Sequence, residues 1–173
     1  DSQGCSLERV LMLYVKNLND APTAISLSSS NINEGNAVNA TIGSLTATDQ
    51  DANESFVFTL VSGAGSVDNN MFNIVNATLR ANQSFNFEVQ STFKIRVRVT
   101  DKASNTFEDS LTISVNDLND VPTDILISKD SLFENLAVNT LVGTFSTIDE
   151  DATQSHSYSF NNIPGNDNAS FNI

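Results

Sequence analysis

The sequence has little cysteine, histidine or tryptophan. Its 173 residues include one cysteine, one histidine and no tryptophan. A lone thiol cannot form an internal disulfide, so the chain is not a disulfide scaffold, and we expect Cys5 to be buried and inert. A serine or cysteine triad needs a base that this chain lacks, since the single histidine, His156, belongs to no such motif. We therefore expect that the chain is not an enzyme.

Positive charge is also scarce. Eight basic residues stand against 21 acidic ones, which gives a formal net charge of −13. Such a field repels phosphate backbones and anionic headgroups, so we expect no nucleic-acid partner. No apolar run approaches the roughly 18 to 20 residues that span a bilayer, and no secretory signal opens the chain. We expect no direct membrane insertion in this segment.

The sequence repeats itself with a period of about 100 residues. Residues 17–23 read Asn-Leu-Asn-Asp-Ala-Pro-Thr, and residues 117–123 read Asp-Leu-Asn-Asp-Val-Pro-Thr. Aligned without gaps, residues 1–55 and 101–155 are identical at 20 positions. A search for such periods comes first because it decides the organisation of the whole chain. The period indicates tandem units of one fold.

The proline-containing segment divides the chain when it is taken as a linker. Residues 1–20 are then the C-terminal end of a preceding repeat, 21–120 a complete repeat, and 121–173 the N-terminal half of a following repeat. Termini rarely fall inside a folded sandwich. We therefore expect a piece of a longer array.

Alternating hydrophobicity predicts strands. Apolar residues from Phe93 to Val99 alternate with Lys94, Arg96 and Arg98, which is the period of a half-buried strand. The same alternation occurs at 111–115, at its counterpart 11–15 and at 56–60, and shorter strands are predicted at 24–28, 42–48, 72–75 and 78–80. Seven or so short strands per unit predict an all-β, Greek-key sandwich of two sheets, joined end to end with its neighbours. We interpret the three bases as a solvated face rather than a polyanion site.

The residues repeated most faithfully are acids and turn residues. Along the complete repeat, acids and their neighbours follow in the order Glu34, Asp49-Gln50-Asp51, Phe85-Asn86-Phe87-Glu88, Asp101 and Asp117-Leu118-Asn119-Asp120. This order resembles the cadherin repeat, with its single Glu, Asp-x-Asp, Leu-Asp-Arg-Glu, loop Asp and Asp-x-Asn-Asp linker. The linker, which ends in Ala-Pro-Thr or Val-Pro-Thr, is more similar to the cadherin-like repeats of microbial surface proteins than to vertebrate ones.

The resemblance implies calcium sites at two junctions. The lower junction would comprise Glu34, Asn86, Glu88, Asp117, Asn119, Asp120, Asp149 and Asp151. The upper junction would comprise Asn19, Asp20, Asp49, Asp51 and Asp101, and would be completed by glutamates of the preceding repeat. Glu134 would serve a third junction. Calcium prefers six to eight oxygen ligands, which acids and amides supply without histidine or thiolate.

Three residues depart from the family pattern and leave the number of ions open. Asn86 replaces an Asp and removes a charge, Phe87 replaces an Arg, and Val121 replaces a linker Asn. A plainer alternative is that the acids are solvated loop residues of an immunoglobulin-type sandwich. Carboxylate pairs can hydrolyse glycosides, but their repetition in each unit argues against an active site.

The resemblance implies an extracellular or cell-surface rod that calcium stiffens, in an adhesion or structural protein. Its partners would be the neighbouring repeats, with other copies or surface proteins as further candidates. Two alternatives stay open: a subunit of an extracellular filament or surface hair, and an accessory ligand- or carbohydrate-binding module of a secreted protein. Five glycosylation sequons, at Asn39, Asn53, Asn76, Asn82 and Asn168, are about what the Asn-, Ser- and Thr-rich composition produces by chance.

Overall fold

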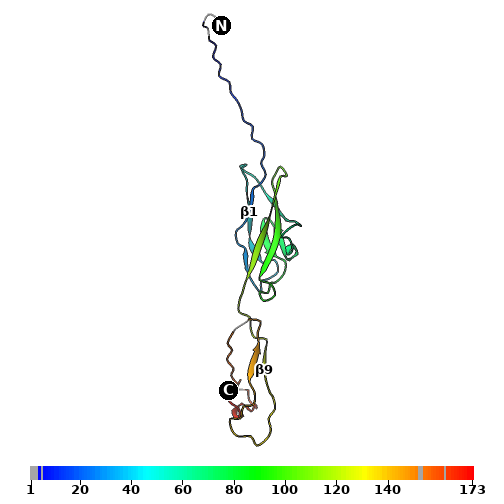
Figure 1. The fold of residues 1–173 in the computed structure, drawn as a ribbon, viewed down its shortest axis with the longest axis vertical. Coiled ribbons are helices and arrows are strands. Elements are labelled where there is room, and N and C mark those ends of the chain that lie inside the picture. The colour runs from blue at the N-terminus through cyan, green and yellow to red at the C-terminus, as the bar shows by residue number, and fades with distance from the viewer. Residues whose placement is uncertain (1–3, 5, 152–153, 162) are drawn as a thin grey trace.

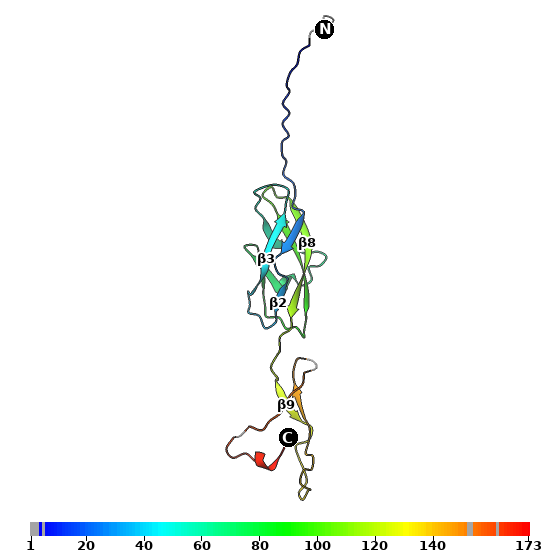
Figure 2. The ribbon, with the colours of Figure 1, turned by 90° about the vertical axis from the view of Figure 1, so that its left-hand side faces the viewer.

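The computed structural model describes residue 4 and residues 6–151, 154–161 and 163–173. Cys5 lies outside the described residues, and so does the expectation that it is buried. Figures 1 and 2 show an extended N-terminal segment, a β-sandwich and a smaller unit with β9 and β10 arranged along one long axis. The elements are β1 (Ala24–Leu27), β2 (Asn31–Asn33), β3 (Thr41–Thr48), β4 (Val57–Leu60), the 3-10 turn η1 (Asn69–Met71), β5 (Phe72–Val75), β6 (Thr78–Ala81), β7 (Thr92–Thr100), β8 (Thr106–Asn116), β9 (Asp124–Ile127), β10 (Phe145–Ile148) and the 3-10 turn η2 (Asn168–Ser170).

Strands β1 to β8 form the predicted sandwich. One sheet has the order β1-β3-β6-β5 and the other the order β2-β8-β7-β4. Neighbours are antiparallel except for β2, which pairs with β8 in parallel. The edge segment thus starts in one sheet as β1 and continues in the other as β2, so that both together act as one strand of a seven-stranded, Greek-key arrangement. The all-β fold class is confirmed.

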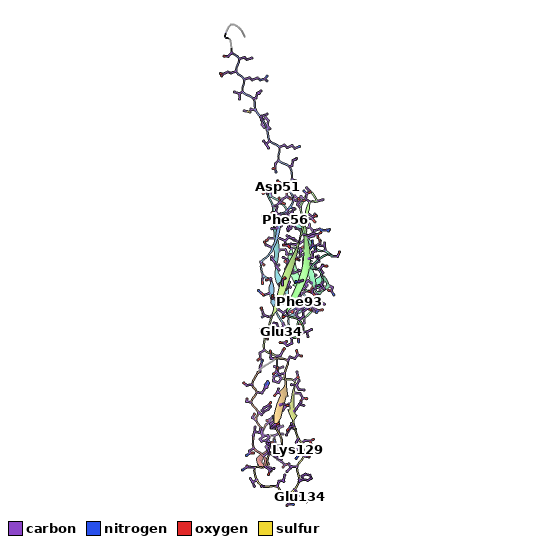
Figure 3. The ribbon with its side chains drawn as sticks, viewed as in Figure 1. Glu34, Asp51, Phe56, Phe93, Lys129 and Glu134 are labelled. Atoms are coloured by element: carbon purple, nitrogen blue, oxygen red, sulfur yellow. The ribbon has the colours of Figure 1, made fainter. Side chains whose placement is uncertain are left out.

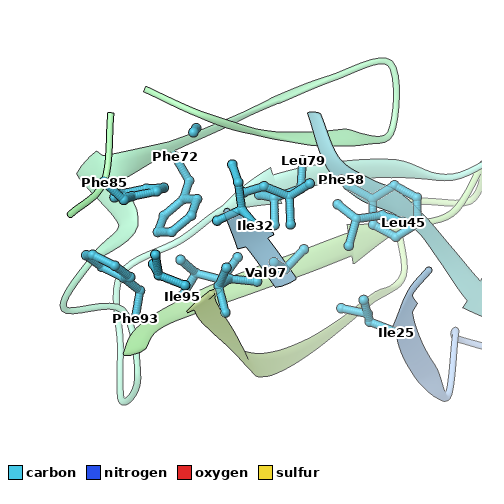
Figure 4. Close-up of a cluster of buried hydrophobic side chains, with 14 of the residues drawn as sticks. Ile25, Ile32, Leu45, Phe58, Phe72, Leu79, Phe85, Phe93, Ile95 and Val97 are labelled. Atoms are coloured by element: carbon cyan, nitrogen blue, oxygen red, sulfur yellow. The ribbon is translucent and has the colours of Figure 1, made fainter. Parts of the chain in front are cut away.

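The alternating apolar side chains of β7 belong to the hydrophobic core. Ile95, Val97 and Val99 are fully buried, and so are Leu79 and Ile113. Figure 4 shows Ile95, Val97 and Leu79 in this core. Burying such side chains is the main favourable term in folding, at about 25 cal/mol per Å² of apolar surface. The strand predicted from the sequence at 93–99 is therefore confirmed as the centre of its sheet.

An aromatic cluster closes the core at one end of the sandwich. The rings of Phe85 and Phe93 have centroids 4.6 Å apart, and Phe72 lies 5.4 Å from Phe85 and 5.8 Å from Phe93. Such pairs stabilise by about 0.5–1.5 kcal/mol beyond the area they bury. Because Phe85 is anchored here, the residues that follow it, from Asn86 to Glu88, are held at the end of the sandwich.

The outer face of β7 carries an ion-pair network. Arg96 Nε lies 2.8 Å from Glu108 Oε2, and Arg98 Nη2 lies 2.6 Å from Glu108 Oε1. Hydrogen bonds from Arg96 and then Arg98 hold the pKa of Glu108 below its usual value. These two arginines therefore already have an anionic partner within the sheet.

Gly43 makes room for the crossing between β1 and β2. A Cβ on Gly43 would lie 2.6 Å from the Ser29 carbonyl oxygen and 2.8 Å from the Ser29 nitrogen. Both are backbone atoms, so the crossing itself would have to move. Gly43→Ala is expected to lower the unfolding free energy by about 1–3 kcal/mol, as overpacked sites do. Urea denaturation would measure this, with the exposed Ser44→Ala as control; an unchanged midpoint for Gly43→Ala would contradict this explanation.

The second unit repeats the start of the first. β9 and β10 pair antiparallel with Ile148 opposite Asp124, as Thr48 lies opposite Ala24 in β1 and β3. Gly143 repeats the close approach of Gly43, since its Cβ would lie 2.8 Å from the Lys129 carbonyl oxygen. The two units therefore share local geometry as well as sequence.

The alternation at 11–15 does not produce a strand in the described residues. Leu11, Leu13 and Val15 are 75%, 93% and 98% exposed. A strand needs a neighbouring strand for its backbone hydrogen bonds, and no described strand pairs with this segment.

The described helical turns, η1 and η2, are far too short to cross a bilayer.

Candidate metal centre

The antiparallel strands deliver the predicted site residues to opposite ends of the sandwich. Glu34 follows β2, residues 86–88 follow β6, and residues 117–120 follow β8, all at the end that faces the second unit. Asp49 and Asp51 follow β3, and Asp101 follows β7, at the other end. Figure 3 shows Glu34 and Asp51 at these two ends, and Glu134 at the far end of the second unit.

The Glu34 carboxylate accepts hydrogen bonds from two other segments of the lower junction. Its side chain is buried, at 7% exposure. Oε1 accepts a hydrogen bond from the Leu118 amide at 2.5 Å, and Oε2 accepts one from the Phe87 amide at 2.7 Å. These two bonds, the Leu118 bond first, hold the pKa of Glu34 below 4.5. One carboxylate thus fixes the linker and the segment after β6 beside β2.

Two groups of three acids occur at the lower junction. Glu34, Glu88 and Asp120 each have an oxygen within 4.8 Å of the others, and the same holds for Glu88, Asp117 and Asp151. Two ligands on opposite sides of one calcium ion, each bonded at 2.3–2.6 Å, are about 5 Å apart. Each group can therefore contact a single ion. Glu88 belongs to both groups, and Asp151 brings an oxygen from the second unit.

Hydrogen bonds from backbone amides and from side chains join the linker to the second unit. The Asp120 amide donates to Asp151 Oδ2 at 2.7 Å, and the Asp151 amide donates to Asp149 Oδ1 at 3.1 Å. Gln154 Nε2 donates to Asn119 Oδ1 at 2.9 Å, and Asn119 Nδ2 donates to the Asp120 carbonyl at 2.6 Å. These contacts hold the Asp-x-Asp loop of the second unit against the linker.

Asp149 has an unpartnered oxygen. Its side chain is only 4% exposed, and Oδ2 has no hydrogen-bond partner among the described residues. The His156 imidazole lies 3.9 Å away, beyond hydrogen-bond distance. A buried carboxylate oxygen without a donor is costly, and a bound cation would satisfy it. This orphaned oxygen, together with the all-oxygen donor set, fits calcium.

Repulsion at the lower junction raises two pKa values. Desolvation, followed by the charges of Glu34 and Glu150, raises the pKa of Asp120 above 3.8. A hydrogen bond from its own backbone lowers the pKa of Glu88, but desolvation and the charges of Glu34 and Asp117 leave it raised above 4.5. The carboxylates therefore favour a proton, or a cation in its place, more than ordinary ones do.

The pKa values of Glu34 and Asp120 are expected to be shifted in opposite directions in the presence of chelator. Because the pKa of Glu34 is lowered, its charge stabilises the fold above about pH 4.5, and this contribution is lost as the pH falls through the folded-state pKa. The raised pKa of Asp120 means that its ionised form opposes folding, and this opposition is relieved as the pH falls through the raised value. Carboxyl-carbon NMR should find Glu34 titrating below an ordinary glutamate and Asp120 titrating above an ordinary aspartate, and shifts in the opposite directions would contradict the arrangement.

The upper junction has the same backbone pattern. The Asp20 amide donates to Asp51 Oδ2 at 2.6 Å, and the Asp51 amide donates to Asp49 Oδ1 at 2.9 Å. Asn19 Nδ2 donates to Asp101 Oδ2 at 2.7 Å and to the Asp20 carbonyl at 2.6 Å. Asp49 Oδ2, like Asp149 Oδ2, is buried and unpartnered among the described residues. Within those residues, no group of three acids gathers here as closely as at the lower junction.

The residue patterns did not predict three contacts. Asn17 Nδ2 donates to Asp51 Oδ1 at 2.6 Å, Gln154 contacts Asn119, and Asn86 Nδ2 donates to Glu150 Oε2 at 2.6 Å. Their only sequence signal is that they lie next to, or within three residues of, predicted ligands. Asn86 Oδ1 also accepts a bond from the Val89 amide at 2.8 Å, so its oxygen is engaged in the turn.

The chain is similar to known proteins in sequence and in fold. The sequence model of the cadherin domain matches residues 28–116, which contain β2 to β8. Human protocadherin-24 EC1-2 has a TM-score of 0.57 at 20% identity, with 76% of this chain and 61% of that chain covered. PcdhgB3 EC1-4 has a TM-score of 0.56 at 21% identity, with 80% and 35% covered.

Protocadherin gammaB7 EC3-6, in a structure of its cis-dimer, has a TM-score of 0.55 at 24% identity, with 77% and 32% covered. This chain thus spans about a third of the length of the two gamma protocadherin segments. No curated protein matches the sequence. The family match extends over half of the chain, and the chain therefore belongs to the cadherin domain family.

Proposed function

We propose that the chain is part of an extracellular rod in which calcium at the junctions holds successive repeats in line. Cadherin domains are adhesion-type extracellular modules that generally bind calcium, and their fold is not an enzymatic one. The proposal rests above all on Glu88, which is shared by two groups of acids, one of which includes Asp151 of the second unit. An ion between them would join the two units.

The mechanism is mechanical. Without a cation, the clustered carboxylates repel one another and favour separation of the units. A divalent ion reverses this interaction and binds only the aligned geometry, so it stabilises that geometry by mass action. Extracellular modules of this kind bind calcium at about 10⁻⁴ to 10⁻³ M. The rod would then be stiff at extracellular calcium concentrations and flexible at the lower concentrations inside cells.

The domain division belongs to the same proposal. Residues 1–20 end one repeat, 21–120 form a complete repeat, and 121–173 begin the next. The principal partners are neighbouring repeats of the same chain, and the chain acts at the cell surface or outside the cell without catalysis. Glutamates of the preceding repeat would complete the upper junction.

A carbohydrate-binding role receives less support. Such modules use exposed aromatic side chains as platforms, yet every aromatic side chain between residues 21 and 120, all of which are described, is buried or half-buried. The filament alternative differs from the rod only in how copies pack side by side, and we give the rod precedence because the acids gather at its ends.

Thermal melting tests the proposal. The chain, extended to include the remainder of the second repeat, would be melted with calcium, with magnesium and with chelator. We expect millimolar calcium to raise the midpoint well above that in chelator, and magnesium to do so much less, because magnesium demands a stricter octahedral shell. A midpoint that calcium leaves unchanged would refute the proposed function.

A further inference from the structure

Asn86 is oriented by the turn that contains it. Its Oδ1 accepts a hydrogen bond from the Val89 amide at 2.8 Å, so its Nδ2 faces away from that turn. Nδ2 donates to Glu150 Oε2 at 2.6 Å, across the boundary between the sandwich and the second unit. An uncharged side chain of one unit thereby positions a carboxylate of the next.

Glu150 is held in the same pocket as the predicted calcium ligands. Glu88, Asp117, Asn119, Asp151 and Glu150 all line this pocket. Glu150 is exposed and could extend into solvent, yet its hydrogen bond with Asn86 holds it at this pocket. Another carboxylate at this position is unfavourable by itself, because like charges repel.

A second, independent feature indicates that a cation belongs here. Asp149, which precedes Glu150, has a side chain only 4% exposed, and its Oδ2 is unpartnered among the described residues. The upper junction differs in one respect, because Gln50 occupies the position that Glu150 has in the lower junction. The extra carboxylate is therefore specific to the lower junction.

We propose that Glu150, positioned by the Asn86 amide, is an additional calcium-binding residue of the lower junction, and that it supplies from the second unit the negative charge that Asn86 lacks. This inference rests on the proposed calcium function. It adds to the lower junction a carboxylate in the Asp-x-Asp loop, where the corresponding loop of the upper junction has Gln50. The lower junction should accordingly bind calcium more tightly than the same junction without that charge.

Calcium titration of the intact chain by calorimetry tests the role of Glu150. Glu150→Gln keeps an oxygen that can accept from Asn86 but removes the charge, so it separates the contact from the electrostatics. Since even outer residues of a metal site alter affinity by about 10- to 100-fold, we expect Glu150→Gln to weaken the lower site by about tenfold. Asp109→Asn, which neutralises an exposed acid on β8, is the matched control and should leave affinity unchanged.

A rescue variant completes the test. In the Glu150→Gln background, Asn86→Asp returns one negative charge to the same contact from the other side, and it should recover part of the lost affinity. If the wild type binds calcium and Glu150→Gln binds it equally well, Glu150 is no ligand and only this inference fails. If the wild type binds no calcium, the proposed function fails with it.

Discussion

Asp120→Ala is expected to remove most of the calcium-induced rise in the melting midpoint. Asp120 belongs to the group with Glu34 and Glu88, and its backbone amide holds Asp151 of the second unit. Losing its carboxylate removes a ligand from the centre of the lower junction. Because changes to residues that only contact the ligands already alter metal affinity by about 10- to 100-fold, the affinity should fall by at least about tenfold. Melting curves with and without calcium measure both effects.

The control for Asp120 is another acid with the same charge. Asp109 lies on β8, is exposed, and contacts only the adjacent Ser110 amide among the described side-chain hydrogen bonds. Asp109→Ala changes the net charge as Asp120→Ala does, but it should leave the calcium response intact. Equal losses in the two variants would mean that calcium senses overall charge rather than a site at the junction.

Ile95→Ala should cause a large loss of stability in the sandwich. Ile95 is fully buried in the central strand β7, next to the Phe93 end of the core. Truncating a buried isoleucine removes its transfer free energy and leaves a cavity, which typically lowers the unfolding free energy by about 2–5 kcal/mol. Urea denaturation in chelator would measure the change without any contribution from calcium.

The neighbouring Lys94 provides the control for Ile95. Its side chain is on the opposite, exposed face of β7. Its backbone amide donates a hydrogen bond to Asp68 Oδ2, and an alanine at this position would keep that bond. Lys94→Ala should therefore change stability by no more than about 0.5 kcal/mol, as surface substitutions usually do. Similar losses in both variants would contradict the assignment of the two faces of β7.

Much of the fold could be predicted from alternation alone. The pattern from Phe93 to Val99 fixes both the strand and its buried face, because a one-residue shift would expose the whole apolar set. The switch of the edge strand between sheets was not predicted, since 24–28 was expected to be a single strand. The sequence between Leu27 and Asn31 is three serines, which carry no hydrophobic period. Gly43, where the crossing passes, was visible only as a repeated glycine.

The segment at 11–15 illustrates what local pattern cannot decide. Its apolar residues at 11, 13 and 15 match those at 111, 113 and 115, with Met12 and Tyr14 in place of Thr112 and Ser114, yet only residues 111–115 are in a described strand. The difference is the neighbour: β8 pairs with β7 on one side and β2 on the other. Strand formation depends on a partner that the local sequence does not specify.

The candidate site was predicted as a set of segments, not as a set of contacts. Repetition identified most of the acids, the resemblance to the cadherin repeat identified Asn86 and Glu88, and the up-and-down course of the strands predicted that these residues meet at the ends. The contact between Asn86 and Glu150 could not be predicted, because it depends on how two units meet across 64 residues of sequence. The middle residue of an Asp-x-Asp loop carries no signal of its own. Whether the gathered acids bind calcium stays a prediction.

The most direct test of the account measures how the two units move relative to each other with and without calcium. Spin labels would be attached at Thr112→Cys on β8 and Ser146→Cys on β10, with Cys5→Ser to remove the native thiol. Pulsed electron paramagnetic resonance would then report the distance between the units. We predict a broad distance distribution in chelator that becomes narrow in millimolar calcium, and that stays broad for Asp120→Ala. An equally broad distribution in calcium and in chelator would contradict the claim that calcium stiffens this junction.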